Sequence, residues 1–130
     1  MVREAKQEYS AIMTKYGLSR TLDNGLAKAM VSAKKRKIRV RIISEIDSSN
    51  SRAAGYLARH VELRSTQDLL FYMDIVDYSQ MLFGPAFPAL DEELGERESD
   101  LWTNNQKFVR GMYSLFERLW AESHRYRSSR

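Results

Sequence analysis

The chain has 130 residues, of which 43% are hydrophobic and 29% charged, a balance typical of one globular domain. It contains no cysteine, which excludes disulfides, thiolate catalysis and cysteine-ligated zinc. No apolar run approaches the roughly 20 residues that span a bilayer and no signal peptide is evident, so we expect a cytoplasmic protein without membrane contact.

The first part of the chain shows helical periodicity. Apolar residues between positions 2 and 16 recur at spacings of three and four, which predicts an N-terminal helix that serves as a linker or a dimer contact. Gly17 is expected to end this helix. Asp23 or Asn24 is then placed to cap a second helix, which runs into a basic turn at residues 34–37.

Strand-like segments occupy the middle of the chain. Isoleucine and valine alternate with arginine from residue 38 onward, which is the period of a strand with one buried face. The predicted order is a strand at 38–44, a helix at 51–60, and strands at 61–64, 69–77 and 80–84. The strand–helix–strand unit predicts a right-handed crossover with parallel strands, and the last two strands predict a hairpin.

The clearest helix comes last, at residues 103–123. Its apolar face includes Phe108, Met112 and Phe116, and Thr103 or Asn104 is expected to cap it. Because such a face is not stable in water, the helix must cover the sheet. These elements predict an α/β sandwich in which a small mixed sheet is flanked by helices, with an N-terminal linker helix and a long C-terminal amphipathic helix.

The sequence gives little support for a histidine-ligated metal site or a glycine-rich phosphate-binding loop. The two histidines, His60 and His124, have no second histidine at metal-ligand spacing, and the six glycines are isolated. We therefore expect neither a metal nor a cofactor.

The stretch LLFYMDIVD, residues 69–77, resembles the frame of the phospholipase D motif, a strand that carries His-x-Lys and ends in Asp. With Asp77 at the aspartate position, Tyr72 falls at the lysine position and Leu70 at the histidine position. In that motif the histidine attacks phosphorus and the lysine neutralises the phosphoryl oxygens. The resemblance implies a scaffold without its attacking groups, and we expect no enzymatic activity.

The order of the other segments resembles the effector domain of archaeal TrmB-type transcription regulators and the phospholipase-D-like sensor domains of archaeal signalling proteins. The matching segments, within residues 17–121, are GLAKAMVSAKKRKIRVRIISEI, NSRAAGYLARHVELRS, LLFYMDIVD and DLWTNNQKFVRGMYSLFERLW. This resemblance implies a phospholipase-D-like sandwich used for ligand sensing or dimerisation beside a DNA-binding or kinase domain. No winged helix precedes it here, so we expect DNA contact only through a separate domain or partner.

The chain is accordingly divided into a linker or dimerisation helix (residues 1–16), a sensor domain (17–123) and a basic tail (124–130). The expected function is ligand-sensing regulation of transcription or signalling by a non-enzymatic homodimer. The candidate ligand site combines two guanidiniums, a phenol and a carboxylate, which suit a sugar or an organic anion. These residues are Arg41, Arg64, Tyr72 and Asp77.

Other interpretations stay open. The two arginines of this site are also placed to form salt bridges with Glu45, Glu62 or Asp74. The basic segment at residues 34–41 offers a different function, the binding of nucleic-acid phosphates. Its candidate residues are Lys34, Lys35, Arg36 and Lys37. A residual phosphodiesterase is a third interpretation.

Overall fold

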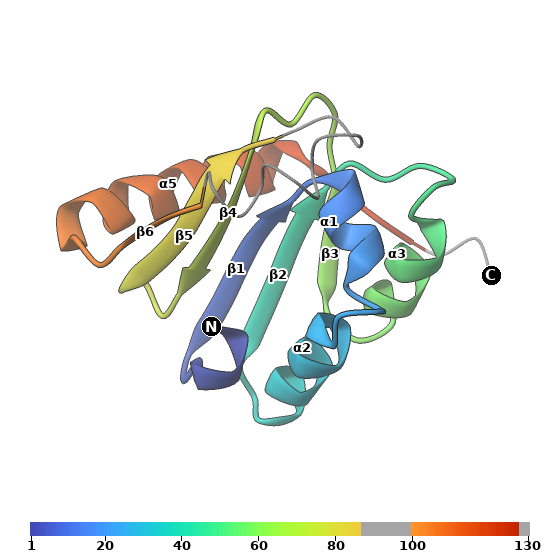
Figure 1. Ribbon diagram of the computed structural model, residues 1–130, viewed down its shortest axis with the longest axis horizontal. Coiled ribbons are helices and arrows are strands. Elements are labelled where there is room, and N and C mark those ends of the chain that lie inside the picture. Colours follow the sequence, from blue (N-terminus) through green and yellow to red (C-terminus); the bar gives the residue numbers. More distant parts are fainter. Residues whose placement is uncertain (87–99, 128–130) are drawn as a thin grey trace.

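The computed structural model describes residues 1–86 and 100–127 of the chain. Within them, seven strands form one mixed sheet, and helices cover both of its faces (Figure 1). The strand order is β6-β5-β4-β1-β2-β3-β7. The strands are β1 (Glu8–Met13), β2 (Arg39–Ser44), β3 (Glu62–Ser65), β4 (Phe71–Val76), β5 (Gln80–Pro85), β6 (Leu101–Thr103) and β7 (His124–Arg125). The expected α/β sandwich is confirmed.

The predicted connections are also confirmed. Strand β2 leads through helix α3 (Ser51–Ala58) to β3, and the two strands are parallel. Strands β4 and β5 pair antiparallel as a hairpin. Strand β4 also pairs antiparallel with β1, which makes the sheet mixed.

The expected N-terminal helix is wrong for most of its length. Residues 2–4 form a short 3-10 turn, η1 (Val2–Glu4), and β1 then lies between β2 and β4. All six residues of β1 are buried. In β1 the polar residues Glu8 and Ser10 alternate with apolar ones only in the first half, and Ile12 and Met13 then follow each other, so the apolar residues also fit a helical period. A contact of this segment with a second copy of the chain stays a prediction.

One face of the sheet is covered by η1 and helices α1 (Lys15–Arg20), α2 (Leu26–Lys35) and α3. Thr14 caps α1, and its hydroxyl accepts a hydrogen bond from the Gly17 N–H at 2.9 Å. Gly17 therefore lies inside the first turn of a helix and does not end one. Gly25, with φ +84°, precedes α2 and marks a tight turn that the sequence analysis missed.

The opposite face is covered by α5 (Gln106–Glu122). Its buried residues Val109, Phe116 and Trp120 pack on side chains of β1, β2, β4 and β5. The cap is Asn105, whose side chain accepts from the Phe108 N–H at 3.0 Å, one or two residues later than expected. The predicted amphipathic helix is otherwise confirmed. Among the described residues, no helix is long and apolar enough to cross a membrane.

The basic tail is partly built into the sheet. His124 and Arg125 form β7, which pairs antiparallel with Ser65 and Arg64 of β3. The Tyr126 N–H donates to the Leu63 carbonyl at 3.0 Å. The chain after α5 therefore returns along the outer edge of β3.

Candidate anion-binding site

The structure brings together only two of the four residues of the predicted ligand site. Arg41 and Arg64 both lie on the face covered by α5, and both guanidiniums lie near the indole of Trp120. Tyr72 points to the opposite face, because its neighbour Met73 packs under α5 and side chains alternate along a strand. The expected meeting of both arginines is found, but Tyr72 does not join them.

Arg41 is held in a buried ion network and is 1% exposed. Its Nη2 donates to the Glu8 carboxylate at 2.7 Å and to the Tyr113 hydroxyl at 2.8 Å. Its Nη1 donates to the Glu117 carboxylate at 2.6 Å. The partners therefore differ from the expected Glu45, Glu62 and Asp74, and two carboxylates already neutralise this guanidinium.

The same network sets the protonation of its members. Burial by itself raises the pKa of Glu8, but hydrogen bonds from Ser10, Arg41 and Tyr78 outweigh it and hold that pKa below its ordinary value. Burial and the adjacent Glu8 charge raise the pKa of Tyr113 well above its ordinary value. At neutral pH the Glu8 carboxylate is therefore ionised, and the hydroxyls of Tyr78 and Tyr113, whose pKa values are both raised, are neutral.

Asp77 has a structural role at the end of β4. Its carboxylate accepts backbone N–H groups of Lys6 at 2.9 Å, Gln7 at 2.7 Å and Glu8 at 2.9 Å. Its φ of +54° is a left-handed conformation that aspartate tolerates better than most residues. This carboxylate fixes the start of β1 against the β4–β5 turn.

The other two motif positions and the basic turn lie apart from these residues. Leu70 lies just before β4 and is 78% exposed. Tyr72 lies on β4, directly opposite Gly84 of β5. Lys34, Lys35, Arg36 and Lys37 are exposed at the end of α2. Arg36 donates to the carbonyls of Arg3 and Ala5, which anchors that turn to the N-terminal segment.

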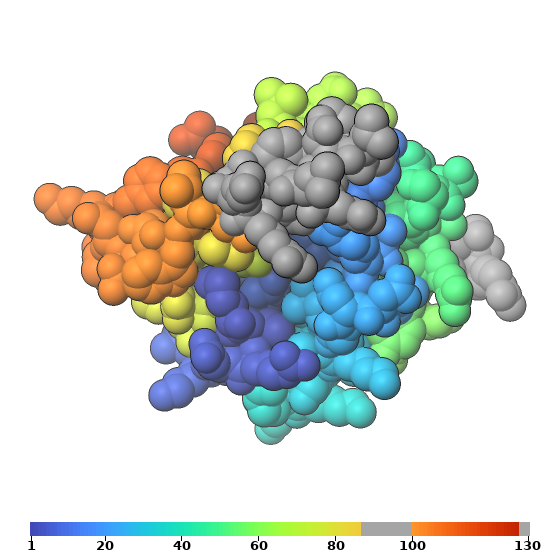
Figure 2. Space-filling model, viewed as in Figure 1, coloured from blue at the N-terminus to red at the C-terminus, as the bar shows by residue number. Residues whose placement is uncertain are grey.

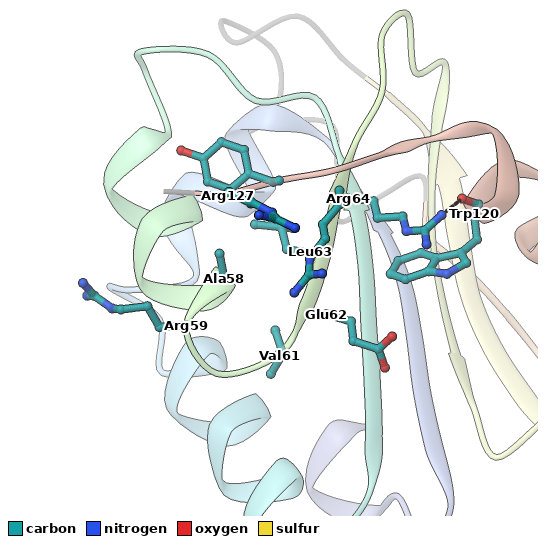
Figure 3. A pocket seen from close by; sticks show the side chains of 10 residues that line it. Ala58, Arg59, Val61, Glu62, Leu63, Arg64, Trp120 and Arg127 are labelled. Atoms are coloured by element: carbon teal, nitrogen blue, oxygen red, sulfur yellow. Dashed lines mark hydrogen bonds between the residues drawn. The ribbon is translucent and has the colours of Figure 1, made fainter. Parts of the chain in front are cut away.

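A pocket of about 640 Å³ lies along the outer edge of β3, next to β7 (Figure 3). It gathers four arginines, two aromatic rings, one glutamate and three apolar side chains. Its lining residues are Ala58, Arg59, Val61, Glu62, Leu63, Arg64, Trp120, Arg125, Tyr126 and Arg127. Bonding along this edge of β3 ends at the Tyr126–Leu63 hydrogen bond, so the start of the strand faces the pocket.

Arg64 and Trp120 make up one side of the pocket (Figure 3). The Arg64 Nη1 donates to the Trp120 carbonyl at 2.6 Å, and its guanidinium carbon lies 4.4 Å from the centre of the indole. The guanidinium of Arg41 lies 5.2 Å from the same centre. The indole therefore connects the pocket to the buried ion network.

Three other guanidiniums of the pocket have open hydrogen-bonding capacity. Arg59, Arg125 and Arg127 are exposed, and no hydrogen bond or ion pair joins their side chains to another described residue. The pocket's glutamate, Glu62, is bonded at 3.2 Å to Arg39. The pocket is therefore strongly positive, and guanidiniums bind carboxylate and phosphate oxygens in a fork geometry.

Of the residues that line this pocket, the sequence analysis predicted only Arg64 as a ligand-binding residue. Arg125 and Arg127 belong to the predicted basic tail, although they alternate with the aromatic Tyr126 as in a short strand. Arg59 gave no sequence signal, because its place beside β3 results from the β2–α3–β3 crossover. The alternation in HRYR was the signal available for the tail.

Comparisons with known proteins bear on the fold. No protein-family model and no curated protein matches the sequence. Several solved structures resemble the chain, and three of them are compared with it. Nuc from Salmonella typhimurium, a phospholipase D family member, has a TM-score of 0.75 at 21% identity, over 98% of this chain and 86% of that chain. NucT from Helicobacter pylori has a TM-score of 0.72 at 14% identity, over 96% and 86%.

The third is TrmBL2, an archaeal chromatin protein with a novel mode of DNA binding, at a TM-score of 0.72 and 14% identity. It aligns with 96% of this chain and 47% of its own length. The fold is phospholipase-D-like. The expected resemblance to both phospholipase D and TrmB-type proteins is thus confirmed at the level of the fold.

The expectation that the chain is not an enzyme is corrected by these neighbours. The phospholipase-D-like fold is shared with Nuc, a phospholipase D family member, and with NucT. Sequence reasoning from the residues at positions 70 and 72 alone therefore does not exclude an enzyme. Turnover of a chromogenic phosphodiester, compared with that of Asp77→Ala, measures the activity directly.

Proposed function

We propose that this chain is a ligand-sensing regulatory domain that binds a small organic anion in the pocket beside β3. The observation that carries the proposal is the gathering of Arg59, Arg64, Arg125 and Arg127 around one pocket. Its volume of about 640 Å³ falls in the range of small-molecule sites, roughly 300–1,000 Å³. The ligand site therefore retains Arg64 from the sequence analysis and replaces its other members.

The regulatory part of the proposal rests on the domain's fold and on the connection between pocket and core. The part of TrmBL2 that aligns with this chain is about half of its length, so in TrmBL2 this fold is joined to other sequence. We propose that the present domain acts as a homodimer beside a DNA-binding domain or partner. A ligand that contacts Arg64 also acts on Trp120 and thereby on α5.

A second candidate is direct binding of nucleic acid through Lys34, Lys35, Arg36 and Lys37. The supporting observation is that these four side chains are exposed on one turn, with Arg36 anchored by the N-terminal segment. Binding of this kind must weaken steeply as salt is raised, because bound phosphates release counterions. Gel shifts with duplex and single-stranded DNA at two salt concentrations measure this dependence.

The primary test is calorimetric titration with citrate, hexose phosphate, phosphate and an uncharged hexose. We expect the anions to bind and Arg64→Gln to weaken them about tenfold, which corresponds to roughly 1.4 kcal/mol. The matched control is Arg118→Gln, which removes an exposed guanidinium of α5 outside the pocket. Equal losses in both variants, or binding of the uncharged hexose alone, would contradict an anion site.

A further inference from the structure

The pocket has more arginines than one carboxylate group can bind. One carboxylate or one phosphate group accepts a fork from one or two arginines. Here Arg59, Arg125 and Arg127 have side chains without a partner among the described residues, and Arg64 stands next to them. Four like charges around one pocket repel one another unless a ligand brings several negative charges.

The shape of the arrangement favours an extended anion over a compact one. The arginines come from the end of α3, from β3, and from β7 and the residue two positions beyond it. The four side chains are therefore carried by separate elements. In Figure 3, Arg127 lies between α3 and β3 and Arg64 extends from β3 toward Trp120, whereas the Arg59 guanidinium points away from both. A linear chain of phosphates presents oxygens along its length, whereas a single phosphate presents them at one point.

We propose, on the basis of the anion site of the proposed function, that the ligand carries a chain of two or more linked phosphate groups. Its phosphates bind to Arg125 and Arg127, and one terminal group competes with the Trp120 carbonyl for Arg64. Two sources supply this chemistry, a nucleoside di- or triphosphate and an inorganic polyphosphate. The ring of Tyr126, which lines the same pocket and is partly exposed, is the group that distinguishes them.

The test is calorimetric titration with ATP, ADP, AMP, adenosine, tripolyphosphate and orthophosphate. If the ligand is a nucleotide, we expect ADP and ATP to bind at least tenfold more tightly than AMP and orthophosphate. If it is an inorganic polyphosphate, we expect the same of tripolyphosphate. Adenosine should not bind in either case. The double variant Arg125→Gln/Arg127→Gln should weaken the tight ligands at least tenfold. Arg110→Gln/Arg118→Gln, which removes two exposed arginines of α5 outside the pocket, should leave affinity within twofold.

The Tyr126→Leu variant separates the two sources while retaining apolar volume against the core. If the ligand is a nucleotide, the wild type prefers ATP over tripolyphosphate about tenfold, since stacking of a base on an aromatic ring contributes roughly 1–3 kcal/mol. Tyr126→Leu then removes that preference and leaves tripolyphosphate affinity unchanged. If the ligand is inorganic polyphosphate, both compounds bind equally in both proteins.

The outcomes separate this inference from the proposed function. Tight binding of citrate or hexose phosphate that depends on Arg64, without tighter binding of any polyphosphate, overturns the inference and leaves the anion site standing. Absence of binding by every anion overturns both. Equal weakening by the α5 double variant overturns the assignment of the pocket, because charge loss anywhere would then explain the effect.

Discussion

Arg64 contacts Trp120 in two ways, through a 2.6 Å hydrogen bond from Nη1 to the Trp120 carbonyl and through a guanidinium 4.4 Å from the indole centre. The carbonyl belongs to the last turn of α5, and it also accepts from the backbone N–H of the C-cap residue Ser123 at 3.2 Å and from the Ser123 hydroxyl at 2.7 Å. One side chain of β3 therefore fixes the end of the helix that covers the sheet, and it is also part of the pocket wall.

The Arg64–Trp120 contact predicts that Arg64→Leu lowers the free energy of unfolding. Loss of a charged hydrogen bond and a cation–π contact should cost about 2 kcal/mol. Urea denaturation followed by tryptophan fluorescence measures the change. Arg110→Leu on the exposed side of α5 serves as the control and should change stability by less than about 0.5 kcal/mol.

The buried network predicts unequal effects of its two carboxylates. Glu8→Gln leaves Arg41 without its buried partner and should cost about 3 kcal/mol, because an uncompensated buried charge is expensive. Glu117→Gln should cost less than about 1 kcal/mol, since the Glu117 side chain is 45% exposed. Similar losses in both variants, measured by chemical denaturation, would contradict the assignment of Glu8 as the principal partner.

The lowered pKa of Glu8 predicts a pH dependence with a defined sign. Because the pKa of this carboxyl is below its ordinary value of 4.5 in the folded protein, the unfolded chain binds the proton first as pH falls. The stability that Glu8 provides is complete well above pH 4.5 and is lost as pH falls through its folded pKa. The difference in unfolding free energy between the wild type and Glu8→Gln should therefore shrink below pH 4.5, and a constant difference from pH 7 to pH 3 would contradict it.

Asp77 predicts a difference between two substitutions. Asp77→Ala removes the acceptor of three backbone N–H groups and places alanine at a positive φ, so it should cost about 2 kcal/mol. Asp77→Asn retains one acceptor oxygen and tolerates the same backbone, so it should cost less than half of that. Thermal unfolding of both variants at pH 7 measures the ranking, and an equal loss would show that the charge alone matters.

Gly84 predicts a steric conflict with Tyr72. A Cβ at position 84 would lie 2.6 Å from the Tyr72 hydroxyl oxygen and 2.8 Å from the adjacent ring carbon. Gly84→Ala should therefore cost about 1–3 kcal/mol, the usual effect of overpacking. The double variant Gly84→Ala/Tyr72→Val should be more stable than the sum of the single effects predicts, because the smaller side chain removes the conflict. Strict additivity in urea denaturation would contradict the close approach.

The sequence by itself determined the elements whose signal is local. The period of α5, the alternation from residue 38 and the β2–α3–β3 crossover all depend on spacing within one segment, and each is confirmed. Polar alternation also placed Arg41 and Arg64 on one face, because β2 and β3 are adjacent and parallel.

Tertiary structure decided everything that depends on a partner distant in sequence. Residues 8–13 form a strand because β2 and β4 offer hydrogen bonds on both sides, and no local period records that. Asp77 binds backbone about 70 residues away, and the end of the chain turns from a basic tail into the wall of a pocket by pairing with β3. Side-chain spacing reports which face a residue occupies, whereas the identity of its neighbours is fixed only when separate segments pack together.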